Sequence, residues 1–85
     1  MIKTIYKYPV GKIIYLPIGA EILEFGYQDN NPFIWCLVDS RAVVEHRYFE
    51  IFGTGWEVDN CDNKEYIATT FNGSFVWHLF EVKDD

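Results

Sequence analysis

The 85-residue sequence lacks long apolar runs and contains only two cysteines, Cys36 and Cys61. No stretch approaches the roughly 20 apolar residues of a membrane-spanning helix, so we expect no membrane segment. Residues 1–20 also lack the basic start, apolar block and cleavage site of a secretory signal peptide. Both absences favour a cytoplasmic protein, in which two reduced thiols are favoured over a disulfide.

Residue sets typical of catalysis are missing as well. The serines, Ser40 and Ser74, lie in or beside expected turns, and the histidines, His46 and His78, do not stand in a metal-ligand spacing. The acidic stretch 59–63 has neither the central glycine nor the terminal glutamate of an EF-hand calcium loop. We therefore expect no enzyme activity, no metal site and no cofactor.

Charge is distributed unevenly along the chain, which carries a net charge of −6. Residues 1–19 hold three lysines and no acid, whereas residues 20–85 hold all 13 acids against four bases. Because no basic stripe could displace many counterions, we expect no binding to duplex nucleic acid. A compact anionic ligand or a partner protein with a basic face fits this charge, and so does a simple role in solubility.

The sequence does contain short β-branched and aromatic segments separated by turn residues. Expected strands cover residues 2–8, 12–16, 21–27, 33–38, 45–52, 65–71 and 74–82. No amphipathic segment is long enough for a helix. Residues 1–85 are therefore predicted to form a single all-β domain, a small antiparallel sandwich or partly open barrel of about seven strands.

Three local features refine this prediction. Pro9-Val10-Gly11 suggests a tight hairpin between the first two strands. The apolar run 33–38 suits a central strand covered on both faces. Asn72-Gly73 predicts a C-terminal hairpin with a type I′ turn, which sets Thr70 opposite Phe75. Both faces of that hairpin are apolar, so one is expected to meet another sheet or another subunit, as in a homo-oligomer.

Six motifs spread over nearly the whole chain carry a family resemblance: Thr4-Ile5-Tyr6-Lys7-Tyr8-Pro9, Leu16-Pro17 with Gly19-Ala20-Glu21-Ile22-Leu23, Trp35 with Leu37-Val38-Asp39, Phe49 with Ile51-Phe52-Gly53-Thr54-Gly55, Tyr66-Ile67-Ala68-Thr69, and Trp77-His78-Leu79-Phe80-Glu81. In these motifs the chain resembles a family of small phage and prophage proteins of unknown function. The resemblance implies a phage origin and the host bacterial cytoplasm as the place of action, and it brings no catalytic residues.

Aromatic side chains are the main candidates for binding. Three Trp, six Tyr and seven Phe are more rings than a small core can use. An aromatic face beside Lys3 and Lys7 of the first strand would suit stacking of a base above a neutralised phosphate. The alternative for each ring is the core or an oligomer interface. The aromatic surplus includes Tyr6, Tyr8, Tyr15, Trp35, Tyr48, Trp56 and Trp77, and of these Tyr6, Tyr8, Tyr48, Trp56 and Trp77 are the candidate site residues.

Gly53-Thr54-Gly55 is the most distinctive short motif. Its backbone amides would suit contact with an anionic ligand, although we favour a bulge or turn that ends a strand as the reason for the glycines. A small enzyme that uses this turn with His46 or His78 is a further alternative.

Together these patterns lead to a functional hypothesis. We expect a non-enzymatic phage accessory protein that binds and neutralises a host component in counter-defence. Its partner would be a host defence protein or a small anionic, nucleotide-like immune signal. A structural or assembly role in the phage, with the extra apolar face buried in a homo-oligomer, is the alternative.

Overall fold

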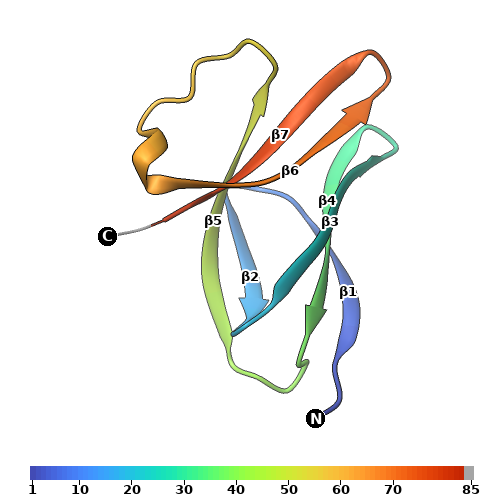
Figure 1. Ribbon diagram of the computed structural model, residues 1–85. Coiled ribbons are helices and arrows are strands. Elements are labelled where there is room, and N and C mark those ends of the chain that lie inside the picture. Colours follow the sequence, from blue (N-terminus) through green and yellow to red (C-terminus); the bar gives the residue numbers. More distant parts are fainter. Residues whose placement is uncertain (84–85) are drawn as a thin grey trace.

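The computed structural model describes residues 1–83 and confirms the all-β prediction (Figure 1). Seven strands form two antiparallel sheets, and a single 3-10 turn, η1 (Cys61–Asn63), precedes the last hairpin. In spatial order, the first sheet contains β1 (Thr4–Pro9), β4 (Asn31–Val38) and β3 (Glu21–Gln28). The second contains β2 (Ile13–Pro17), β5 (Val44–Gly53), β7 (Phe75–Val82) and β6 (Lys64–Asn72).

The connection between β1 and β2 joins the two sheets. The Val10 N–H donates to the carbonyl of Pro32 at 3.0 Å, which extends the pairing of β1 with β4. Two residues later the carbonyl of Lys12 accepts a hydrogen bond from the Phe49 N–H at 3.0 Å and begins the pairing of β2 with β5. The predicted hairpin at residues 9–11 is therefore wrong, because the chain bends there and changes sheets.

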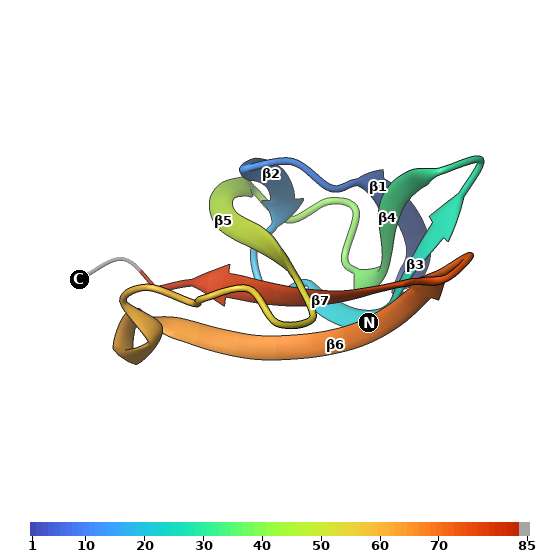
Figure 2. The same cartoon turned by 90° about the horizontal axis from the view of Figure 1, so that it is seen from above.

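The opposite side of the molecule is open. β3 packs beside β6, but the two strands belong to different sheets, so no closed barrel forms. At the hairpin tips Asn72 Nδ2 donates to Asn30 Oδ1 at 3.2 Å, and Figure 1 shows these tips next to each other. The second sheet is strongly curved, with β2 and β5 rising away from the layer of β6 and β7 (Figure 2). A partly open barrel describes this arrangement.

The core lies between the inner faces of the two sheets. It is formed by Ile14, Leu16, Ala20, Phe25, Ile34, Cys36, Val38, Phe49 and Leu79. In β4 only alternate residues are buried, while Phe33, Trp35 and Leu37 on the outer face are half-buried. The prediction of a strand covered on both faces is thus wrong: β4 is central in its sheet, but in the described part of the chain no second layer covers its outer face.

The turn of the C-terminal hairpin differs from the predicted type I′ arrangement. Asn72 pairs with Phe75, so the β6–β7 turn is centred on Gly73 and Ser74, and Thr70 lies opposite Trp77 rather than Phe75. Gly73 has φ +61°, and glycine at the first central position is the type II′ arrangement. The two residues with positive φ that a type I′ turn requires occur instead between β3 and β4, at Asp29 and Asn30.

Candidate functional site

The edge of β5 that faces β2 is only half occupied. β2 pairs with β5 from Val44 to Tyr48, whereas β5 continues to Gly53. The Phe49 N–H points to this edge, since it donates to Lys12. Alternate residues of a strand direct their backbone groups to the same edge, so those of Ile51 and Gly53 also point there, where no strand within residues 1–83 pairs with them.

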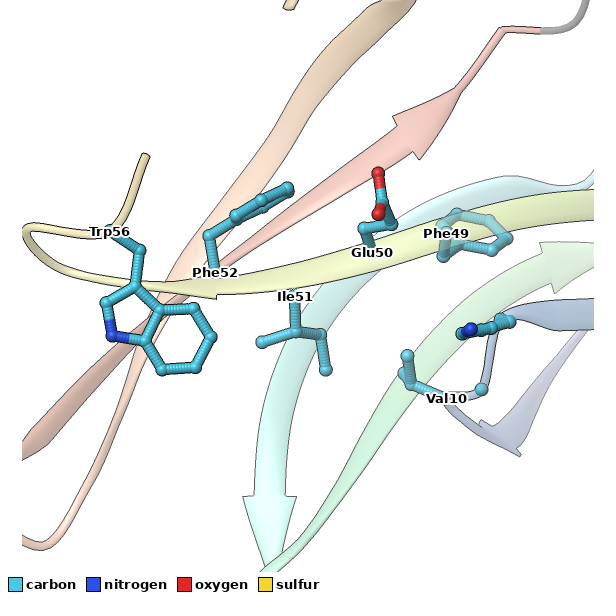
Figure 3. Close-up of a pocket in the computed structure, with 8 residues that line it drawn as sticks. Val10, Phe49, Glu50, Ile51, Phe52 and Trp56 are labelled. Carbon is cyan, nitrogen blue, oxygen red and sulfur yellow. The ribbon is translucent and has the colours of Figure 1, made fainter. Parts of the chain in front are cut away.

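A groove of about 400 Å³ follows this open edge. One wall comes from the bend between β1 and β2, and the other from β5 and the turn that follows it. Figure 3 shows Ile51 and Trp56 on one side of β5 and Glu50 and Phe52 on the other, so the groove straddles the strand edge. The lining residues are Val10, Gly11, Lys12, Phe49, Glu50, Ile51, Phe52 and Trp56.

The turn after β5 presents Trp56 to the groove. The Trp56 N–H donates to the carbonyl of Gly53 at 3.1 Å, and Gly55 has φ +91°. The indole packs directly against Gly53, where a Cβ would stand 2.9 Å from its Cε2 and Nε1 atoms. Trp56 nevertheless remains 59% exposed, which leaves a large, rigid aromatic surface available for contact.

One of the three amides expected to serve an anionic ligand, that of Thr54, is used within the turn region, and so is the amide that follows the motif, that of Trp56. The Thr54 N–H donates to the carbonyl of Val76 at 3.3 Å, and that of Trp56 closes the turn. Glycine here therefore serves the close approach of Trp56 and the backbone conformation at Gly55.

An aromatic cluster continues from Trp56 into the molecule. Trp77 meets Trp56 edge-to-face, with ring centroids 5.7 Å apart, and lies near Tyr27 and Phe75 at 6.3 and 6.0 Å. The Nε1 atom of Trp77 is buried without a hydrogen-bond partner among the described residues. The structure thus brings together Gly53, Trp56 and Trp77 of the predicted site residues.

A chain of polar contacts lies on the outer face of the second sheet, away from the groove. Thr54 Oγ1 is 2.7 Å from His78 Nε2, and His78 Nδ1 is 2.8 Å from Thr69 Oγ1, which is 2.6 Å from the Tyr66 hydroxyl. These contacts hold the imidazole in place. Hydroxyl and imidazole groups at this distance can exchange a proton, but Thr54 and His78 do not line the groove. His46 is elsewhere, stacked on Tyr15.

The predicted basic and aromatic residues of β1 are divided between its two faces. Tyr8 packs against the core, and this burial raises its pKa, with Tyr6 on the same side of the strand. Lys7 lies on the outer face, where Nζ is 4.5 Å from the centroid of Phe33 and donates to Gln28 Oε1 at 2.9 Å. A side chain reverses its face at each residue of a strand, so Lys7 and the tyrosines cannot form one platform.

Two further predicted residues also lie away from the groove. Lys3 precedes β1 and is exposed. Tyr48 lines a separate cleft with Asn63, Val82 and Lys83. The ten predicted site residues therefore fall into separate groups.

Three residues that line the groove, Val10, Lys12 and Ile51, were not identified from the sequence. Apolar strand residues and a single lysine have no distinctive sequence pattern. The signal that could have found them is the unequal length of the paired strands: β2 has five residues and β5 has ten.

A buried ion pair stabilises the sheet at the other end of β5. Arg47 Nε and Nη2 donate to Glu81 Oε2 and Oε1 at 2.7 and 2.8 Å, and Nη1 donates to the carbonyl of Ala20 at 2.7 Å. Burial disfavours ionisation of Glu81, but the hydrogen bonds and charge of Arg47 outweigh this effect and hold the pKa of Glu81 below its ordinary value. This fixed pair connects the inner faces of β5 and β7.

Within residues 1–83, no group of three or more histidine, cysteine, aspartate or glutamate residues is arranged to hold a metal ion. No helix in the described part of the chain is long and apolar enough to cross a membrane. Searches of curated proteins and of solved structures found no match. A family model described as a domain of unknown function, DUF7352, matches residues 1–85, and the chain belongs to that family.

Proposed function

We propose that this protein is a non-enzymatic, phage-encoded accessory protein that acts in the host bacterial cytoplasm by stoichiometric binding. Its task is to neutralise a host defence component. The observation that carries the proposal is the groove at the open edge of β5, where the exposed indole of Trp56 stands beside backbone groups that have no strand partner. A complex is stabilised when a partner buries a rigid aromatic ring and when it makes hydrogen bonds to unpaired peptide groups.

A host protein suits this groove better than a nucleotide-like signal. The lining contains one cation, Lys12, together with the acid Glu50, within a chain of net charge −6. Lys3 and Lys7, the residues expected to neutralise a phosphate, are not among its lining residues. The groove therefore offers an anionic ligand few positive charges to offset the cost of removing its own charge from water.

A second candidate function, assembly into a homo-oligomeric part of a phage, is favoured by the outer face of the second sheet. Several large apolar side chains are exposed on its strands, a pattern typical of interaction surfaces. They are Ile13, Tyr15, Tyr48, Tyr66 and Phe71, with exposures from 38 to 70%.

The test is purification of tagged protein from bacterial cells, followed by mass spectrometry of proteins and small molecules that remain bound. We expect a host protein at a fixed ratio to the wild type, and its loss from Trp56→Ala. Tyr15→Ala is the matched control, because Tyr15 is 60% exposed but lies on the outer sheet face.

Retention of the partner by Trp56→Ala would contradict binding at the groove. A bound nucleotide-like compound in place of a protein would overturn the choice of partner. Native mass spectrometry of the same samples addresses assembly: a homo-oligomer that dissociates on Tyr15→Ala would favour the second candidate.

A further inference from the structure

We infer that the partner contributes an extended strand, which pairs with the open edge of β5 and has alternating apolar and basic side chains. This inference rests on the proposed function, since it identifies the kind of segment that the groove would bind. Pairing with a free strand edge supplies affinity through main-chain hydrogen bonds, whereas pockets on either side select the side chains.

The backbone geometry supports strand addition. β2 ends its pairing with β5 at Tyr48, and the chain then bends towards the other sheet at Val10 and Lys12. A partner strand would occupy the position that β2 leaves, beside Glu50 to Gly53, a length of about 14 Å at 3.4 Å per residue. The free groups at this edge belong to Ile51 and to the N–H of Gly53, because the carbonyl of Gly53 is bonded to Trp56.

The two sides of the groove explain why apolar and basic side chains should alternate along the partner strand. Successive side chains of an added strand point to opposite faces of the sheet. Those on the inner side would enter the space between Val10, Ile51 and Trp56, which is apolar. Those on the outer side would lie towards Glu50 and the acidic segment that follows Trp56.

The charges around the outer side select basic residues. Glu50 of β5 and Asp59 of the following segment line one cleft with the two lysines Lys12 and Lys64, and Glu57 and Asp62 belong to the same segment as Asp59. The Lys64 side chain is only 4% exposed, and its Nζ is already 3.4 Å from Glu50 and bonded to the carbonyl of Asp59. Glu57 and Asp62 form no ion pair among the described residues.

The same charges argue against a second copy of this chain as the occupant. Two copies joined edge to edge along β5 would place their acidic segments near each other, and each copy carries a net charge of −6. The basic and aromatic segment of this chain, Thr4–Pro9, is already paired with β4. The structure therefore favours a strand from another protein.

A displayed library of random eight-residue peptides tests the inference directly. We expect selection on the wild type to enrich peptides in which apolar residues alternate with lysine or arginine, and we expect Trp56→Ala to lose them. The absence of enrichment, or enrichment of acidic or non-alternating peptides, would overturn the inference.

Backbone methylation of an enriched peptide then distinguishes strand pairing from side-chain binding alone. Two versions carry N-methyl groups on alternate amides, in the two possible registers. Only the version whose methylated amides face β5 should lose affinity, by at least tenfold. Equal affinity of the two versions would show that no strand is added, while a Trp56-dependent partner from cells would still support the proposed function.

Charge reversal completes the design. The variant Asp59→Lys should weaken peptide binding at least tenfold at low salt, because its side chain is 79% exposed and shares a cleft with Glu50 and Lys12. Glu24→Lys, the same charge reversal at an exposed position on β3, is the control and should alter affinity less than twofold. Equal effects of the two reversals would contradict local charge selection.

Discussion

The indole of Trp56 lies so close to Gly53 that any Cβ on residue 53 would stand 2.9 Å from the ring. No real Cβ tolerates such a contact, so an alanine there forces the ring to move. The ring can move, since Trp56 is 59% exposed and sits in a turn at the end of β5. Gly53 does not have a positive φ, so alanine meets no backbone strain at this position.

We therefore predict that Gly53→Ala displaces Trp56 without unfolding the protein. The indole N–H signal of Trp56 should shift in an NMR spectrum, and affinity for an enriched peptide should fall several-fold. Gly26→Ala is the matched control, because its Cβ would lie 3.5 Å from the ring of Trp35, an ordinary contact. An unshifted Trp56 signal in Gly53→Ala would mean that the ring is not packed against Gly53 in solution.

The turn between β6 and β7 leads to a second prediction, about register. Gly73 has φ +61°, whereas Asn72 is paired with Phe75 as the last residue of β6. Gly73→Ala should therefore destabilise the protein by about 1 kcal/mol, since a Cβ is strained at positive φ. Asn72→Ala should cost less, because it loses only an exposed hydrogen bond to Asn30.

Urea unfolding of the two variants measures the difference. If Asn72 and Gly73 were together at the centre of a type I′ turn, both alanines would be strained and both variants would be destabilised. That result would contradict the register described above.

This turn also shows how far the sequence determines the fold. Segments rich in β-branched and aromatic residues, separated by Gly, Pro and Asn, predict the seven strands within a few residues. Local sequence does not state which strand pairs with which. Pro9-Val10-Gly11 is compatible with a hairpin or with a bend between sheets, and only the contacts of Val10 and Lys12 with other strands decide between them.

The candidate site was predictable only in part for the same reason. Trp56 was found because it is a large aromatic residue beside a glycine-rich turn. The open edge at Ile51 was not, since it arises from the shortness of β2 relative to β5 after pairing. Lys7 and Tyr6 were wrongly expected to act together, although the two-residue period of a strand already places neighbours on opposite faces.

The Arg47–Glu81 pair leads to a prediction about acid stability. Because Arg47 holds the pKa of Glu81 below its ordinary value of 4.5, folding favours the ionised carboxylate. This contribution is fully present above about pH 4.5 and is lost as pH falls through the lower pKa of the folded state. Stability of the wild type should therefore decline in the acid range through this group.

Glu81→Gln removes the titrating carboxylate and leaves Arg47 with a buried, unpaired charge. Loss of one partner from a buried pair costs about 3 kcal/mol, so the variant should be that much less stable at pH 7. Denaturant unfolding from pH 3 to 7 measures the cost of the substitution and its pH dependence. The difference in the free energy of unfolding between wild type and variant should become smaller at low pH. Lys3→Gln is the control, because Lys3 is exposed and precedes β1, away from Glu81. If this difference in the free energy of unfolding stayed constant across pH, Arg47 would not be lowering the pKa of Glu81 in the folded protein.

The two cysteines should differ sharply in reactivity. Cys36 is fully buried in β4, and burial raises the pKa of its thiol to about 11, so almost no reactive thiolate exists at pH 8. Cys61 is exposed at the start of η1. Iodoacetamide at pH 8 should therefore modify Cys61 in the native protein, and Cys36 only when the chain unfolds. Mass spectrometry of modified peptides measures each site separately, and Cys61→Ser isolates the response of Cys36. Rapid native modification of Cys36 would mean that the core between the two sheets opens readily in the native protein.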